Sequence, residues 1–215
     1  MKVKICGITN VETALAAAAA GADYLGLVFA PSRRRVSTAA AREIITGTKG
    51  QPKAPRMVGV FVNQSTAEVN ATAAECGLDL VQLSGDEDWD FCRQVHRPVI
   101  KALHISPEST PAGILGEIAR GQKRAGTERL ICLLDTAIPG QYGGTGQTFN
   151  HRLARAVAAR FPVIIAGGLN PETVEQVVRE VRPWGIDVSS GVETAGKKDS
   201  GKIGDFIRRA KTAGE

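Results

Sequence analysis

The sequence alternates eight times between a short apolar segment and a longer amphipathic segment, and this alternation is what most constrains the fold. Short apolar runs predict strands, and apolar residues repeating every 3.6 positions predict helices. The predicted strands cover residues 2–6, 23–29, 57–62, 79–83, 98–103, 130–134, 163–166 and 185–189. The predicted helices follow them at residues 11–20, 38–46, 65–76, 88–95, 112–124, 150–160, 171–181 and 202–212.

This order of elements predicts an α/β fold with a closed sheet. Eight parallel strands joined by right-handed helical crossovers close as a (β/α)8 TIM barrel. An open doubly wound sheet is the alternative, but no G-x-G-x-x-G motif follows the first predicted strand. No linker divides the chain, so we expect residues 1–215 to form a single barrel domain, a length common for such folds.

Three predicted helices begin with capping signals. Thr9 with Glu12, and Ser65 with Glu68, have the spacing of a capping box. Asn170 precedes a proline at the first position of the next-to-last helix, where proline is favoured. These local signals support the helix starts independently of hydrophobicity.

The composition excludes several classes of protein. An apolar fraction of 43% with 23% charged residues is typical of a folded globular chain. The net charge of +5 comes without a long basic run, and only two Trp and two Tyr are present, which favours an anionic small molecule over nucleic acid. No apolar run reaches membrane-spanning length and no signal peptide is evident, so we expect a cytoplasmic protein without a membrane partner.

The four cysteines and three histidines show no metal-ligand spacing, which predicts free thiols and no metal site.

Candidate reactive groups lie where predicted strands end, because active sites of such barrels form at the carboxyl ends of the strands. Cys6 ends the first strand, although most buried cysteines are inert apolar residues. Asp135 ends "RLICLLD" before the glycine-rich "TAIPGQYGGTG", and a helix cap or salt bridge is its alternative role. Arg33, Arg34 and Arg35 follow the second strand; such runs are usually solvated, but one arginine could bind a carboxylate.

Two glycine-containing segments predict a phosphate site. "AGGLNPE" and "SSGVE" follow the last two strands, where barrels of this kind often bind phosphate through backbone N–H groups. The residues concerned are Gly167, Gly168, Ser189, Ser190 and Gly191. Each glycine alone could equally serve a turn, but their occurrence together favours phosphate.

Several segments, taken together, resemble one known family along nearly the whole chain. They are "KICGIT", "GADYLGLVF", "VGVFVN", "LLDT" before "GGTGQTF", "AGGLNPE" and "IDVSSGVETAGKKD". The pattern resembles phosphoribosylanthranilate isomerase of tryptophan biosynthesis. The resemblance implies an Amadori rearrangement of N-(5-phosphoribosyl)anthranilate to 1-(2-carboxyphenylamino)-1-deoxyribulose 5-phosphate. It also implies a phosphoribosyl small molecule as the substrate, without cofactor or metal.

The resemblance also implies a role for each candidate residue. Cys6 would be the general base and Asp135 the general acid, while Arg35 would bind the anthranilate carboxylate. Asp187 would lie close to the reacting sugar. The five glycine and serine residues of the two predicted phosphate loops would surround the phosphate.

This chemistry sets electrostatic requirements. A protonated Asp135 would donate to the furanose ring oxygen, and a Cys6 thiolate would then remove the proton from C2 of the sugar. A thiolate requires nearby positive charge or hydrogen-bond donors. No residue near Cys6 is identified from the sequence as the source of that charge or of those donors.

One segment departs from the family pattern. After the fourth strand the family typically reads Q-L-H-G-E, whereas "QLSGDED" places Ser84 where the histidine is expected. We expect this to change hydrogen bonding away from the reacting atoms. Lys101 and His104, near the end of the fifth strand, have no orienting partner nearby in sequence and are predicted to be structural.

Two other functions fit parts of the pattern. A non-catalytic barrel that binds a phosphosugar would keep the glycine loops and use Cys6 and Asp135 only structurally. A related sugar isomerase of histidine biosynthesis uses two aspartates, and the thiol at the end of the first strand argues against it. A barrel of this size can act as a monomer or a homodimer.

Overall fold

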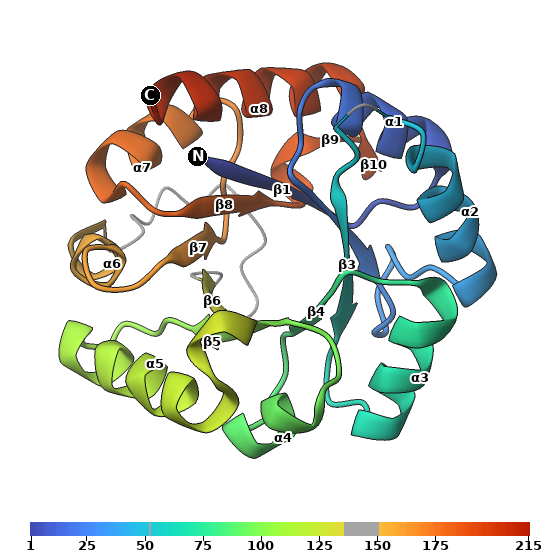
Figure 1. Cartoon of the computed structure of the whole chain (residues 1–215). Helices are drawn as coiled ribbons and strands as arrows, with labels where there is room; N and C mark the ends of the chain where they lie inside the picture. The colour runs from blue at the N-terminus through green and yellow to red at the C-terminus, as the bar shows by residue number, and fades with distance from the viewer. Residues whose placement is uncertain (52, 136–150) are drawn as a thin grey trace.

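The chain folds into a closed barrel of eight parallel strands surrounded by helices (Figure 1). The computed structural model describes residues 1–51, 53–135 and 151–215. The strands are neighbours in sequence order, and β8 pairs with β1 to close the barrel. The predicted (β/α)8 fold is therefore confirmed.

The strands and helices alternate without interruption. The barrel strands are β1 (Lys2–Cys6), β2 (Tyr24–Val28), β3 (Arg56–Phe61), β4 (Leu80–Leu83), β5 (Val99–His104), β6 (Leu130–Asp135), β7 (Val163–Ala166) and β8 (Gly185–Val188). The α-helices are α1 (Val11–Ala19), α2 (Thr38–Thr48), α3 (Thr66–Cys76), α4 (Trp89–Gln94), α5 (Pro111–Ala125), α6 (His151–Ala158), α7 (Val174–Val181) and α8 (Ser200–Ala213). The order agrees with the prediction, and only the ends of elements differ.

Short elements near the ends of two strands were not predicted. A 3-10 turn, η1 (Thr127–Arg129), precedes β6, and another, η2 (Ser190–Val192), follows β8. After η2 the chain forms an antiparallel hairpin of β9 (Glu193–Thr194) and β10 (Lys197–Lys198). Strands of two charged or polar residues carry no hydrophobic alternation, so pattern analysis could not find them.

The capping box predicted at Thr9 and Glu12 is wrong. Helix α1 begins at Val11, so Asn10 occupies the N-cap position, and its side-chain oxygen accepts the Thr13 N–H at 2.8 Å. Asparagine at this position satisfies an N–H group at the helix start that has no partner within the helix.

Of the other two capping predictions, the one at Ser65 is confirmed, whereas the one at Asn170 is wrong because Thr173 is the N-cap of α7. Ser65 and Glu68 form a reciprocal capping box at the start of α3. The Asn170 side chain accepts the Thr173 N–H at 2.9 Å, but the intervening residues form a turn and α7 begins only at Val174.

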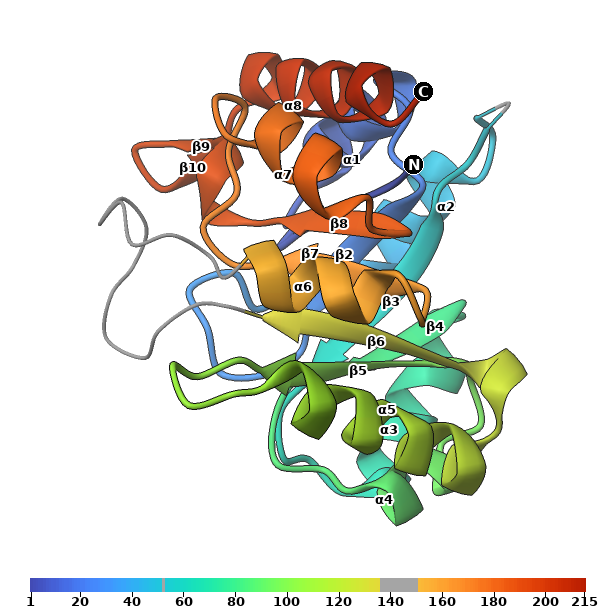
Figure 2. The same cartoon turned by 90° about the vertical axis from the view of Figure 1, so that its left-hand side faces the viewer.

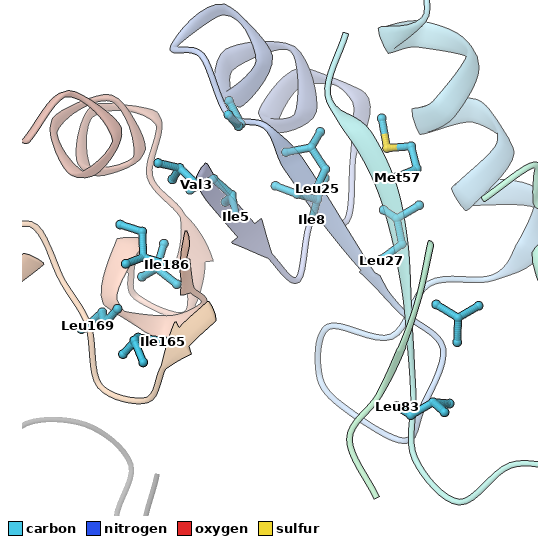
Figure 3. Close-up of a cluster of buried hydrophobic side chains, with 14 of the residues drawn as sticks. Val3, Ile5, Ile8, Leu25, Leu27, Met57, Leu83, Ile165, Leu169 and Ile186 are labelled. Atoms are coloured by element: carbon cyan, nitrogen blue, oxygen red, sulfur yellow. The ribbon is translucent and has the colours of Figure 1, made fainter. Parts of the chain in front are cut away.

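The alternation of side chains along the strands separates two apolar clusters. Leu80, Leu133 and Ile164 belong to a cluster inside the barrel. Val3 and Ile5 of β1 belong to the larger cluster between the strands and the helices, together with the neighbouring leucines of β2 (Figure 3). Because successive side chains of a strand point to opposite faces, Lys4 and Cys6 face the barrel interior.

The two ends of the barrel carry different parts of the chain. In Figure 2 the N- and C-termini lie on one side of the molecule, whereas the β9–β10 hairpin lies on the other. Since β1 starts near the N-terminus and the hairpin follows β8, the hairpin marks the carboxyl ends of the strands. The predicted site residues belong to this end.

Candidate active site

Cys6 lies at the carboxyl end of β1 with 8% of its surface exposed. It is paired across the sheet with Gly26 of β2, which has no side chain. A Cβ atom added to Gly26 would lie 2.8 Å from Cys6 Sγ and 3.2 Å from Lys4 Nζ. The thiol and the lysine ammonium therefore border the same small space beside β2.

Lys4 forms a buried ion pair with Asp187 across the seam between β1 and β8. The two residues are paired in the strand register, and Lys4 Nζ lies 3.0 Å from Asp187 Oδ1. Burial alone would lower the pKa of Lys4, but the negative charges of Asp187 and of an ionised Cys6 raise it. Burial raises the pKa of Asp187, and the charge of Lys4 opposes that shift. We conclude that Lys4 is a charged ammonium inside the barrel.

Lys4 is a charged neighbour of Cys6 that was not predicted from the sequence. Burial raises the pKa of the Cys6 thiol, whereas the positive charge of Lys4 and a hydrogen bond from it favour the thiolate. Asp187 acts against ionisation, and Lys198 of β10 acts for it. The available signal was the spacing, because residues two apart in a strand share a face.

Asp135 ends β6 and faces the same interior. It is two residues beyond Leu133, which belongs to the cluster inside the barrel. The charge of Asp135 contributes to raising the pKa of Asp187, so these carboxylates lie close enough to interact. The structure thus groups Asp135 with Asp187, Lys4 and Cys6. The predicted cover "TAIPGQYGGTG" lies outside the described residues.

The loops after β7 and β8 are in backbone contact. Gly167 and Gly168 adopt positive φ angles of 95° and 66°, a conformation that favours glycine. A Cβ atom on Gly191 would overlap the carbonyl oxygen of Leu169. The structure therefore brings together the two segments predicted to bind phosphate, which include Gly167, Gly168, Ser189, Ser190 and Gly191.

The loop after β8 is also hydrogen-bonded to the end of β1. The Ser189 hydroxyl donates to the Cys6 carbonyl oxygen at 3.2 Å. Lys198 Nζ donates to the Ser189 carbonyl oxygen at 2.8 Å. Burial lowers the pKa of Lys198, although its bond to Glu193 opposes that shift.

The three arginines after β2 differ in what they bind. Glu193 accepts from Arg34 Nε at 2.6 Å, from Arg33 Nη2 at 2.6 Å and from Lys198 Nζ at 3.0 Å. Burial would raise the pKa of Glu193, but the bonds from Arg34 and Lys198 lower it to about 2. Arg35 is exposed, and in the described parts of the chain its guanidinium makes no hydrogen bond or ion pair.

Lys101 does not face the barrel interior. Its ammonium lies 3.0 Å from the buried Glu87 carboxylate and donates to the Gly85 carbonyl oxygen at 2.7 Å. These bonds hold the loop after β4 and agree with the structural role predicted for Lys101.

Ser84, which stands where the family pattern has histidine, bonds to two neighbours. Its hydroxyl accepts from Gln82 Nε2 at 3.0 Å, and its carbonyl oxygen lies 3.1 Å from His104 Nε2. Ser84 therefore takes part in hydrogen bonding among β4 and β5.

The remaining cysteines differ from Cys6 in their surroundings. All four cysteines are free. Burial raises the pKa of Cys92 to about 11 and that of Cys132 to about 12, which keeps both as thiols near neutral pH. No metal-binding group of three or more His, Cys, Asp or Glu side chains occurs in residues 1–51, 53–135 and 151–215.

The fold and the site define a class of protein. A closed (β/α)8 barrel that gathers a thiol, two carboxylates, a buried ammonium and a glycine-lined loop pair at the carboxyl ends of its strands is a TIM-barrel enzyme. The comparisons with known proteins identify the family within this class.

A family profile described as N-(5'-phosphoribosyl)anthranilate (PRA) isomerase matches residues 3–209. An N-(5'-phosphoribosyl)anthranilate isomerase of Dehalococcoides mccartyi is 47% identical over 213 residues, covering 99% of this chain and 97% of that protein. The chain belongs to the N-(5'-phosphoribosyl)anthranilate isomerase family, as the sequence resemblance implied.

Solved structures agree with this assignment. The phosphoribosyl anthranilate isomerase of Thermotoga maritima matches with a TM-score of 0.83 and 40% identity, covering 99% of both chains. A structure of such an isomerase with reduced 1-(o-carboxyphenylamino)-1-deoxyribulose 5-phosphate matches with a TM-score of 0.79 and 38% identity, again over 99% of both chains.

Proposed function

We infer that this chain converts N-(5-phosphoribosyl)anthranilate to 1-(2-carboxyphenylamino)-1-deoxyribulose 5-phosphate, an aldose–ketose isomerisation in L-tryptophan biosynthesis. Its membership of the family supports this reaction. The observation that carries the mechanism is that Cys6 and Asp135 both face the interior beside the Lys4–Asp187 pair. We assign residues 1–215 to one catalytic domain.

Substrate binding would use exposed polar groups at the carboxyl end of the barrel. The touching loops after β7 and β8 would take the phosphate, because partly exposed glycines allow an anion to approach the backbone. Their proposed ligands are Gly167, Gly168, Ser189, Ser190 and Gly191. The exposed guanidinium of Arg35 would bind the anthranilate carboxylate.

In the acid step, Asp135 gives its proton to the furanose ring oxygen. The C1–O bond breaks, and the anthranilate nitrogen supplies electrons to form a protonated Schiff base at C1. This opens the ring and makes the hydrogen on C2 acidic. Asp187, held by Lys4 at 3.0 Å, would lie close to the reacting sugar.

In the base step, the Cys6 thiolate takes the proton from C2. The electron pair of the C–H bond forms the C1–C2 double bond of an enolamine, and the Schiff-base nitrogen is neutralised. Tautomerisation then gives the ketone. Every step moves only electron pairs within the substrate and protons between the substrate and the enzyme, with no net oxidation or reduction, so the mechanism requires no cofactor or metal.

Two single substitutions test the acid–base assignment. We expect Cys6→Ser and Asp135→Asn each to lower kcat by about 10² to 10⁴-fold, the usual contribution of general acid–base catalysis. Cys76→Ser, a buried thiol of α3, is the matched control for the first change, and Asp90→Asn in α4 for the second. Both controls should retain activity.

Full activity in folded Cys6→Ser or Asp135→Asn would overturn that residue's role. A folded wild-type protein that binds a phosphosugar without isomerising the substrate would favour the non-catalytic barrel.

The remaining expectations concern the setting of the enzyme. No helix in the described parts of the chain is long and apolar enough to span a bilayer. A cytoplasmic location and the absence of a nucleic-acid partner stay predictions. The oligomeric state is predicted to be a monomer or a homodimer, which analytical ultracentrifugation distinguishes. One matched structure is of monomers generated from a dimeric isomerase of Thermotoga maritima.

A further inference from the structure

We propose that Lys4 is a positioning residue that stabilises the thiolate of Cys6, and that Asp187 controls this effect by sharing the same ammonium. The proposal rests on the assignment of Cys6 as the base. It adds a residue whose task is to keep a buried thiol able to ionise.

The backbone places the two groups together. Lys4 and Cys6 lie two residues apart on β1 and face the interior, while the opposing position on β2 is Gly26. Sγ and Nζ both lie within 3.2 Å of the point where a Gly26 side chain would begin, so the two groups border the same space. Only glycine at position 26 leaves this space open.

The ammonium of Lys4 has bonding capacity beyond its ion pair. Its side chain is 1% exposed, so water cannot readily satisfy it. An ammonium carries three N–H donors. In the described parts of the chain its one carboxylate contact is Asp187 at 3.0 Å, and the Cys6 thiol is its other acidic neighbour. Ionisation of Cys6 therefore adds an acceptor beside a donor that is already in place.

The charged groups around Cys6 come from several elements and have opposing effects. Lys4 of β1 and Lys198 of β10 favour the thiolate, while Asp187 of β8 opposes it. Lys198 is already bonded to Glu193 and to the Ser189 carbonyl oxygen. Asp135 of β6 acts on Asp187, and the aliphatic part of Arg34 covers Gly7 next to the thiol. Lys4 is thus the cation with the strongest influence on Cys6.

This arrangement predicts opposite effects from removing the two members of the pair. Replacing Lys4 by methionine removes the favourable charge, so ionisation of Cys6 should become harder. Replacing Asp187 by asparagine removes the opposing charge and the competitor for the ammonium, so ionisation should become easier. A structural role of the pair, limited to holding β1 against β8, would give the same direction for both.

The experiment measures the alkylation of Cys6 by iodoacetamide at several pH values, with the Cys6 peptide quantified by mass spectrometry. Lys4→Met should slow alkylation near neutral pH by about tenfold, the effect of one pKa unit. Asp187→Asn should accelerate it, and Lys4→Arg should retain most of the wild-type rate. Lys101→Met is the matched control, since it also breaks a buried lysine–carboxylate pair, and should leave the rate unchanged.

Shifts of Lys4→Met and Asp187→Asn in the same direction would overturn the proposal, as would an unchanged rate in Lys4→Met. If Lys4→Met does not fold, the proposal is still overturned when folded Asp187→Asn shows no faster alkylation of Cys6 than the wild type. The measurement needs no substrate, so it is independent of the isomerase assay. Retained activity in Cys6→Ser would refute the proposed base even if the alkylation rates shift as expected.

Discussion

Two buried lysine–carboxylate pairs lie on opposite faces of the same barrel wall. Lys4 and Asp187 meet inside the barrel, whereas Lys101 and Glu87 meet outside it, and each nitrogen lies 3.0 Å from its oxygen. All four side chains are nearly inaccessible to solvent. The pairs therefore look alike until their other bonds are compared.

The outer pair is saturated by the protein. Glu87 also accepts the backbone N–H groups of Asn63 at 2.7 Å and Gly85 at 2.9 Å, and Lys101 also donates to the Gly85 carbonyl oxygen. The inner pair has no comparable set of backbone bonds in the described residues; its additional neighbour is the thiol of Cys6. A saturated pair stabilises a loop, while a pair with unused donors beside a titratable group can support chemistry.

The largest expected effects come from removing the carboxylate of each pair and comparing the free energy of unfolding and kcat of the two variants. Glu87→Gln should lower the free energy of unfolding by about 3 kcal/mol or more, because it leaves Lys101 buried without a counter-charge. Asp187→Asn should cost less, because an ionised Cys6 can still pair with Lys4. In the folded variants, kcat should fall strongly for Asp187→Asn, because Asp187 is proposed to lie beside the reacting sugar even though its loss eases ionisation of Cys6, and little for Glu87→Gln.

Urea unfolding and steady-state kinetics on the same preparations measure both quantities. Equal losses of stability and of kcat in the two variants would remove the distinction between the pairs.

A second comparison concerns glycines at and away from the site. Gly191→Ala should reduce kcat/KM on the order of 100-fold, because the added methyl group displaces the Leu169 backbone and with it the proposed phosphate loop. Gly204→Ala in α8 meets no atom within 4 Å and should keep wild-type kinetics. If Gly191→Ala is folded and fully active, the contact between the loops is not needed for binding.

A third comparison concerns arginines with and without a partner in the protein. Arg35→Ala should raise KM about tenfold, consistent with the loss of a charge-assisted hydrogen bond worth about 1.5 to 3 kcal/mol. Arg33→Ala should change KM less, because Arg33 already binds Glu193. Initial rates over a range of substrate concentrations provide the values. Equal and negligible changes would refute the carboxylate-binding role of Arg35.

The smallest expected effect is on how the stability of the folded protein changes with pH in the acidic range. The pKa of Glu193 is lowered from 4.5 to about 2, so its contribution is present above pH 4.5 and is lost as the pH falls toward 2. The unfolding temperature of Glu193→Gln should therefore fall less over this range than that of the wild type. Glu43→Gln, on the exposed face of α2, is the control and should behave as the wild type. Parallel curves for Glu193→Gln and wild type would contradict the prediction.

The order of strands and helices could be read from the sequence because it follows from hydrophobic periodicity, which is local. The start of α1 at residue 11 was predicted, but its N-cap was assigned wrongly because Thr9 and Asn10 are both good capping residues, and only the backbone geometry decides between them. The hairpin containing Glu193 and Lys198 has no apolar pattern. These errors arise where polar residues, rather than apolar spacing, determine the structure.

The candidate site was predictable only in part for a related reason. Cys6 and Asp135 could be found because each ends a strand. Lys4 was missed because lysine is rarely buried. Its position two residues before Cys6 on the same strand was therefore not taken as evidence that its side chain lies inside the barrel. Its partner Asp187 is 183 positions away, and only the register between β1 and β8 brings the two side chains together.

The position of this seam has a consequence for folding. The first and last strands of the barrel supply Cys6, Lys4 and Asp187, so these groups meet only through contacts of very long sequence separation. Such contacts carry the largest loop-closure entropy cost and form late. A chain ending before β8 can build most of its strand pairs but not the surroundings of its base. The appearance of activity during refolding would therefore report closure of the whole barrel.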